Sequence, residues 1–162
     1  MVAGLVVVMG CSAAPDPRIL TEPLLVDAEL DADQRQAVQA AVDLWSNATD
    51  GRFAPELRFG SVECEDAFAI EAVPEQGCSI GLRVRTADGR MGQVLGATVP
   101  DEHSVAVAAW LDGDAFRDVV AHELGHYLLL GHGDGIMAQP RDRLSSEVSA
   151  RSVDEFCDTW GC

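Results

Sequence analysis

Four residues in the C-terminal third of the chain have the types and spacing of a metal-dependent hydrolytic centre. His122 and His126 are spaced i, i+4, so on an α-helix they lie one turn apart and both imidazoles can reach one ion. Glu123 lies beside them, angled to reach a water molecule on the ion rather than the ion itself. His132 follows as the candidate third ligand. This is the His-Glu-x-x-His arrangement with an added histidine.

The chemistry of zinc explains why these residue types stand together. A catalytic zinc ion takes three protein ligands, with imidazole nitrogens at ~2.0–2.1 Å, and keeps one position for water. The ion lowers the pKa of that water to about 7, and a carboxylate then takes its proton and passes it to the leaving amine. Glu123 is the candidate for this general base, and one Zn²⁺ is the expected cofactor. The competing interpretation is a helix with surface histidines beside an acidic residue.

Residues 113–130 are expected to form the helix that presents these side chains. Its apolar positions recur every fourth residue and mark a buried stripe, roughly opposite the two histidines: Phe116, Val120 and Leu124. An apolar strand over 104–110 precedes it. This context, together with the added His132, favours the metal site over a solvated helix.

The same stretch resembles the metzincin clan of zinc metallopeptidases, and within it the matrixin-like enzymes. That family has His-Glu-x-x-His-x-x-Gly-x-x-His followed by a Met-turn. Here His-Glu-Leu-Gly-His at 122–126 precedes His132 and then Ile136-Met137. The resemblance implies zinc held by the three histidines, Glu123 as general base, Met137 beneath the ion, and hydrolysis of internal bonds in a peptide or protein substrate.

The resemblance also implies the fold. It predicts an α+β, zincin-like architecture, with two main helices packed on a twisted mixed β-sheet, a Met-turn and a short C-terminal helix. Residues 93–99 resemble the edge strand along which substrate backbone pairs in the family. Residues 144–147 and 153–160 resemble its C-terminal helix.

The chain departs from the family pattern just before the third histidine. The family's glycine, which breaks the helix so that the histidine can turn back, is Leu129 here. The sequence therefore predicts that Gly131 supplies the break, because glycine tolerates positive φ. Asp134 and Glu147 are the alternative third ligands, and His132 is preferred to both.

The remaining elements belong to one metallopeptidase domain at 24–162. Asp31 and Gln34 form a capping-box pattern that begins a helix with one buried stripe. Four segments are expected to be strands, from their apolar or alternating patterns: 24–26, 57–62, 80–85 and 104–110, besides the edge strand at 93–99.

The N-terminus is typical of a lipoprotein signal. An apolar, uncharged run over 2–9 leads into Gly10-Cys11, which resembles the lipobox of bacterial lipoproteins. That resemblance implies a signal peptide at 1–10, a lipid on Cys11, and a proline-containing tether at 11–23. No Lys or Arg precedes the run, in departure from a typical signal peptide. The competing interpretation is a buried N-terminal strand with an ordinary cysteine.

The other cysteines favour an exported protein. Four remain besides Cys11, and an even number in an exported chain suggests two disulfides. Their positions are Cys64, Cys78, Cys157 and Cys162. Three pairings are open, of which Cys64–Cys78 with Cys157–Cys162 is the local choice.

Charge narrows the classes of partner. The chain has 162 residues and a net charge of −16, so its surface repels phosphate backbones and anionic lipid. We expect no nucleic acid partner, membrane contact only through the lipid, a monomer, and a location in the bacterial cell envelope or outside the cell. Two other functions stay open: a zinc-containing, non-catalytic binding lipoprotein, and a zinc hydrolase acting on a non-peptide bond.

Overall fold

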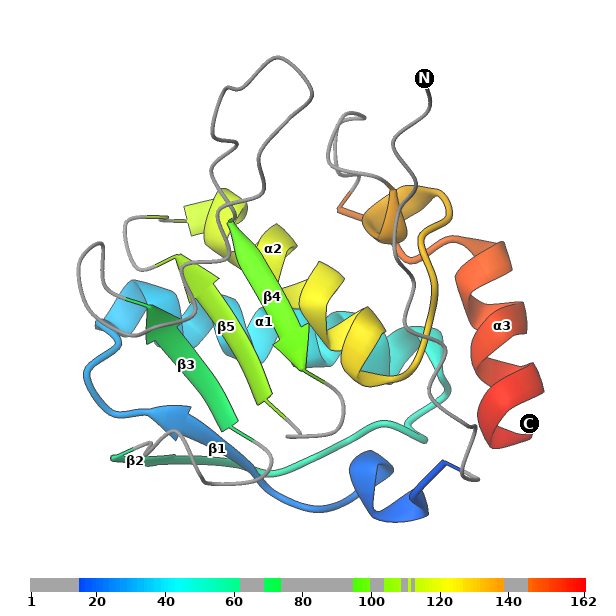
Figure 1. The fold of residues 1–162 in the computed structure, drawn as a ribbon, viewed down its shortest axis with the longest axis horizontal. Helices are drawn as coiled ribbons and strands as arrows, with labels where there is room; N and C mark the ends of the chain where they lie inside the picture. The colour runs from blue at the N-terminus through cyan, green and yellow to red at the C-terminus, as the bar shows by residue number, and fades with distance from the viewer. Residues whose placement is uncertain are drawn as a thin grey trace, which may run out of the picture.

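A five-stranded sheet is the layer on which the fold is built. The computed structural model describes residues 15–61, 69–73, 95–99, 104–108, 111, 113–138 and 146–162. The strands are β1 (Leu24–Asp27), β2 (Leu57–Gly60), β3 (Ala69–Val73), β4 (Gly96–Val99) and β5 (Ser104–Ala108), in the spatial order β2-β1-β3-β5-β4. All neighbours are parallel except β4, which runs antiparallel to β5. The sheet is therefore mixed, with β4 at one edge (Figure 1).

Helix α1 (Ala32–Ala48) begins where the sequence predicts. The Asp31 carboxylate accepts a hydrogen bond from the Gln34 backbone N–H at 2.8 Å, and the Gln34 side chain accepts one from the Asp31 N–H at 3.2 Å. This capping box satisfies two backbone donors that the first turn leaves free. The helix then buries one apolar stripe: Ala37, Val38, Ala41, Val42 and Trp45.

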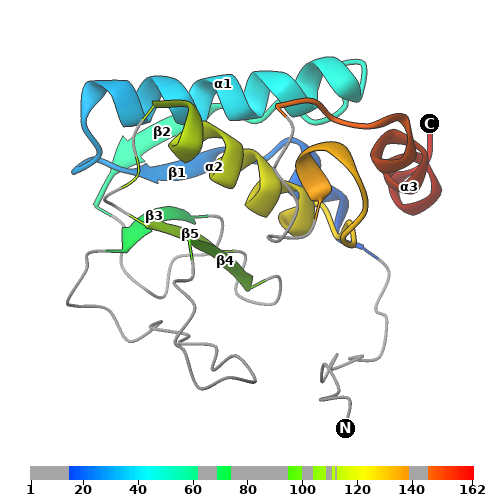
Figure 2. The same ribbon diagram turned by 90° about the horizontal axis from the view of Figure 1, so that it is seen from above.

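Helix α2 (Gly113–Tyr127) packs between α1 and the strands β5 and β4, so both long helices lie on one face of the sheet (Figure 2). The two helices are joined by a buried hydrogen bond, in which Trp45 Nε1 donates to the Ala121 carbonyl at 2.7 Å. Phe116, Val120 and Leu124, the predicted stripe, are fully buried. The core between helices and sheet thus fixes the position and rotation of α2.

A C-terminal segment follows helix α2. It contains the 3₁₀ turn η3 (Gly135–Met137) and helix α3 (Ala150–Trp160), which lies at one end of the two long helices (Figures 1 and 2). Ser149 caps α3 by accepting from the Ser152 N–H at 3.2 Å, and Phe156 is fully buried. No helix in the described part of the chain is long and apolar enough to cross a bilayer.

The predicted architecture, a mixed sheet with two helices on one face, is confirmed, although its details differ. Strand β3, a short Ala-rich segment without clear alternation, is not among the expected strands. The strand expected at 93–99 includes β4, and the one expected at 104–110 includes β5. Residues 93–94 and 109–110 lie outside the described residues. The strand expected at 80–85 lies outside the described residues.

The packed part of the chain begins earlier than residue 24. Within the expected tether, Pro17–Leu20 forms a 3₁₀ helix, η1, and Ile19 is buried in the core. The Leu20 carbonyl also accepts a hydrogen bond from the Ala54 N–H at 3.3 Å. The burial of apolar residues, rather than the proline content, determines where the packed domain begins. Residues 1–14, which include the expected signal and Cys11, lie outside the described residues.

Candidate metal centre

Helix α2 carries His122, Glu123 and His126 on the side that faces β4 and the loop following the helix. His122 is 6% exposed and Glu123 is 7% exposed, so these polar side chains sit within the protein rather than on a solvated face. Gly125, between the two histidines, costs helix stability on its own. A Cβ at this glycine would overlap Met137 Sδ and lie 2.9 Å from Trp45, so close packing explains the residue.

The three histidine rings meet at their tips. His126 Nε2 lies 3.2 Å from His122 Nε2 and 3.2 Å from His132 Nε2, and one ligand atom of each ring lies within 4.8 Å of the others. Two nitrogens bound at ~2.0–2.1 Å to one tetrahedral zinc ion are about 3.3 Å apart. The two distances from His126 therefore fit an ion of that size, and the third ring pair lies within 4.8 Å.

Hydrogen bonds on the far side of two rings fix their tautomers. His122 Nδ1–H donates to the Ile136 carbonyl at 2.7 Å, and His126 Nδ1–H donates to the Leu130 carbonyl at 2.9 Å. Each Nε2 then carries a lone pair and no proton, as a metal ligand requires. Two such lone pairs facing each other repel unless a cation lies between them, so the donor set fits a metal ion.

Burial also favours the neutral form of these ligands. Burial lowers the pKa of His126 to about 4, and it lowers the pKa of the more exposed His132, where His122 adds to the effect. Near neutral pH both rings are uncharged, and a metal ion does not have to displace a proton from them.

Glu123 points to strand β4. Its Oε2 accepts a hydrogen bond from Thr98 Oγ1 at 2.7 Å, and the same hydroxyl lies 2.9 Å from the Glu123 carbonyl oxygen. Burial raises the pKa of the Glu123 carboxyl group, while the hydrogen bond from Thr98 and the electrostatic interaction with His122 partly oppose that shift. A raised pKa suits a carboxylate that must hold a proton transiently.

The turn that brings His132 back differs from the prediction. Helix α2 ends at Tyr127, before the expected residue 130, and Leu129 itself adopts the left-handed conformation with φ 67°. The Leu130 N–H bonds the Gly125 carbonyl at 3.0 Å and the Leu129 N–H bonds the His126 carbonyl at 2.9 Å, which is a Schellman cap. The prediction that Gly131 supplies the break is wrong, because the cap forms around leucine.

Met137 lies in the turn η3, next to the part of α2 that carries the histidines. It is fully buried, and its sulfur packs against Gly125. The turn is closed by the Gly133 N–H, which donates to the Met137 carbonyl at 2.8 Å, and the Ile136 N–H donates to the Glu147 carbonyl at 2.8 Å. Because the Ile136 carbonyl also accepts the hydrogen bond from His122, this turn fixes the orientation of the His122 ring.

The C-terminal segment holds the loop that carries His132. Glu155 Oε1 accepts a hydrogen bond from the Gly131 N–H at 2.8 Å, and Trp160 Nε1 donates to the Leu128 carbonyl at 2.9 Å. Ser149 Oγ donates to Asp134 at 2.6 Å. The chain on both sides of His132 is thus tied to residues 149–160.

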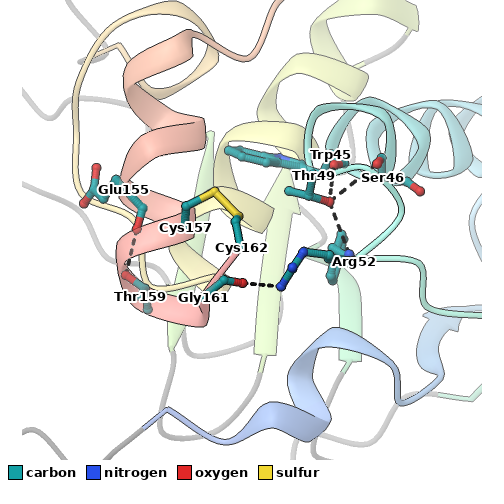
Figure 3. The surroundings of a disulfide bond; sticks show 10 residues. Trp45, Ser46, Thr49, Arg52, Glu155, Cys157, Thr159, Gly161 and Cys162 are labelled. Atoms are coloured by element: carbon teal, nitrogen blue, oxygen red, sulfur yellow. Dashed lines mark hydrogen bonds between the residues drawn. A yellow bond between two sulfur atoms is a disulfide. The ribbon is translucent and has the colours of Figure 1, made fainter.

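A disulfide closes the end of this segment. Cys157 is bonded to Cys162, which is the local pairing, whereas Cys64 and Cys78 lie outside the described residues. The Arg52 guanidinium donates to the Gly161 carbonyl, so the chain after α3 is also attached to the region following α1 (Figure 3).

The structure separates the expected ligands from the alternatives. Asp134 and Glu147 are not part of the histidine cluster; Asp134 accepts from Ser149, and the backbone carbonyl of Glu147 accepts from Ile136. Nothing in the sequence singles out Thr98 or Glu155, since a polar residue on a strand or helix carries no local signal of a distant contact. Gly96 does carry a local signal, because it lies inside the strand expected at 93–99 and glycine inside a strand often marks a close backbone approach.

Comparisons with known proteins agree with this architecture. No protein-family model and no curated protein matches the sequence. Among solved structures, the chain is similar to archaemetzincin from Methanopyrus kandleri, with a TM-score of 0.59 and 14% sequence identity. The superposition covers 87% of this chain and 96% of archaemetzincin. At this identity the likeness shows a shared fold, and the chemistry must be argued from the site.

Proposed function

We propose that this protein is a zinc-dependent endopeptidase of metzincin type. One observation carries the proposal: the Nε2 atoms of three histidines converge beside a buried glutamate, and two of their three pairs are 3.2 Å apart. The fold shared with archaemetzincin supports the same conclusion. A site that merely binds zinc does not need a buried carboxylate at Glu123, whereas hydrolysis needs a base there.

The residues of the chain divide the work of hydrolysis. His122, His126 and His132 would hold the ion, which when bound supplies a lowered pKa for water and polarisation of a peptide carbonyl. Glu123 takes the proton of the attacking water and delivers it to the leaving amine. Its burial keeps the carboxylate out of bulk solvent and raises its pKa toward the value that this transfer needs.

Strand β4 offers a place for the substrate backbone. It lies at the edge of the described sheet and its residue Gly96 lies against Glu123. An extended peptide can pair with the open side of such a strand, which would place its backbone beside the base. We therefore infer that peptide or protein segments bind in extended form along β4.

Metal analysis and peptide cleavage together test the proposal. Purified protein is expected to contain about one zinc ion per chain and to cleave members of a peptide library. Glu123→Gln keeps the three histidines and is expected to retain zinc while losing cleavage. Folded protein without zinc affinity would overturn the site. Zinc without cleavage in the wild type would favour the non-catalytic binding protein.

We also propose that the protein is a lipid-anchored monomer of the bacterial cell envelope. The lipobox-like segment ending at Cys11 supports the anchor, and the Cys157–Cys162 disulfide is of the kind that persists in oxidising compartments. Metabolic labelling with a radioactive fatty acid should mark the wild type and not Cys11→Ser. Unlabelled wild type, recovered in the soluble fraction, would contradict the anchor.

A further inference from the structure

Strand β4 presents a fitted surface to the carboxyl group of Glu123. Gly96 and Thr98 are two residues apart on this strand, so both face the same side of the sheet, toward α2. Thr98 Oγ1 lies 2.7 Å from Glu123 Oε2. A Cβ on Gly96 would lie 2.7 Å from both Glu123 Cγ and Oε1. The strand thus gives the carboxylate a hydroxyl at Thr98, and at Gly96 the absence of a side chain lets Glu123 pack against the strand.

The hydroxyl of Thr98 restricts how the Glu123 side chain can turn. It also lies 2.9 Å from the carbonyl oxygen of Glu123, so one side chain touches the backbone and the carboxylate of the same residue. A hydroxyl has one proton, and a carboxylate is the stronger acceptor. The proton therefore goes to Oε2, and among the described residues Thr98 is the side chain that hydrogen-bonds this carboxyl group.

A carboxylate at this depth needs such a partner. Glu123 is 7% exposed, and burying a charge without hydrogen bonds costs free energy. Without a hydrogen-bond partner, the side chain would also be less restricted to one rotamer. With Oε2 held by Thr98, Oε1 is the oxygen left for water. We propose that Thr98 is a positioning residue for the general base, fixing Oε2 so that Oε1 is presented to the attacking water. This inference rests on the proposed peptidase function.

Valine and serine at position 98 separate the hydroxyl from the shape of the side chain. Thr98→Val keeps the volume and the strand preference but removes the donor, whereas Thr98→Ser keeps the donor. Thr98→Val is expected to lower kcat by about 10- to 100-fold, the range for a hydrogen bond to a charged group. KM should stay near the wild-type value, because the backbone edge of β4 is intact, and Thr98→Ser should restore most of kcat.

A second measurement does not depend on cleavage. In metal-free protein labelled with ¹³C at the glutamate carboxyl carbon, the resonance lost in Glu123→Gln identifies Glu123. At a fixed pH this resonance should move in Thr98→Val and return toward its wild-type position in Thr98→Ser. Circular dichroism and zinc content should be equal in all variants, which excludes a general loss of structure.

The outcomes distinguish this inference from the proposed function. An unmoved Glu123 resonance in Thr98→Val, or an equal loss of kcat in the valine and serine variants, would overturn the role of Thr98 while leaving the peptidase intact. Wild type that cleaves no peptide, with a resonance that moves as expected, would overturn the peptidase function and retain the hold of Thr98 on Glu123.

Discussion

The candidate site has two halves that are held in different ways. The helix half consists of His122, Glu123 and His126 on α2, where packing against α1 and the sheet fixes the backbone. The loop half is His132, which is exposed and lies beyond the end of the helix. Local helical geometry sets the first half, whereas contacts with residues distant in the sequence set the second.

The difference follows from what surrounds each half. The backbone of α2 is saturated by its own hydrogen bonds, and His122 is further anchored by the Ile136 carbonyl. The loop has few such bonds of its own, so Glu155 and Trp160 supply them from α3. Changes in the loop half should therefore leave the structure of the helix half intact. Changes in the helix half should disturb the position of the loop half more.

Removing one histidine from each half should give equal losses of zinc and unequal losses of stability. His122→Ala and His132→Ala should each weaken zinc binding by on the order of 100-fold or more, since each ligand contributes ~3 kcal/mol of binding free energy. In metal-free protein, His122→Ala should lower the free energy of unfolding by about 1–3 kcal/mol, because it leaves the buried Ile136 carbonyl without its donor. His132→Ala should change it by under about 0.5 kcal/mol. Urea unfolding with a chelator present measures both; equal destabilisation would contradict the comparison.

Acid should expose the buried character of the helix half. Folding lowers the pKa of His126 to about 4, whereas in the unfolded chain a histidine has its ordinary pKa of about 6.5. As the pH falls from 6.5 to 4, the unfolded chain binds a proton at this histidine before the folded protein does. The free energy of unfolding therefore falls between pH 6.5 and pH 4, and above pH 6.5 this histidine leaves it unchanged.

The difference in unfolding free energy between wild type and His126→Gln isolates this effect in metal-free protein. It should fall by about 3 kcal/mol from pH 7 to pH 4. The same comparison with His132→Gln should show a smaller change, because that ring is exposed. Curves of wild type and His126→Gln that stay parallel would show that His126 is not desolvated.

The two halves also differ in how far the sequence predicts them. The i, i+4 spacing and the stripe of Phe116, Val120 and Leu124 predict the helix half, since 3.6 residues per turn determine which side chains share a face. The capping box that begins α1 is equally local. Strand β3 escapes prediction because its short, Ala-rich sequence takes its conformation from its parallel neighbours.

The loop half escapes prediction for the same reason. Propensity argues against leucine at positive φ, and it therefore moves the break to Gly131. In the structure, burial of Leu128 and Leu130 and the two bonds of the Schellman cap outweigh the strain at Leu129. Neither Glu155 nor Thr98 has a spacing that indicates its partner, because these contacts arise only when distant elements pack.

Removing the hydrogen bond between helix α3 and the loop that carries His132 should lower zinc affinity without unfolding the helix half. Glu155→Ala removes the acceptor of the Gly131 N–H, so the loop loses a hydrogen bond next to His132. We expect zinc affinity to fall by about tenfold, as for other groups that support metal ligands, with little change in the stability of metal-free protein. Asp154→Ala, an exposed charge on the same helix, is the control and should leave zinc affinity unchanged. Equal affinities in both variants would show that α3 does not hold the metal loop.

Relieving the strain between the two halves should produce the smallest effect. Leu129 has φ 67° and is 41% exposed, so glycine there would release backbone strain at the loss of little apolar burial. Alanine removes the same side chain but keeps the Cβ that makes positive φ unfavourable. Leu129→Gly should therefore unfold at a free energy about 1 kcal/mol above that of Leu129→Ala, and zinc affinity should be alike in the two. If Leu129→Ala were the more stable, residue 129 would not be the left-handed residue that ends helix α2. The change of chain direction before His132 would then lie at another residue.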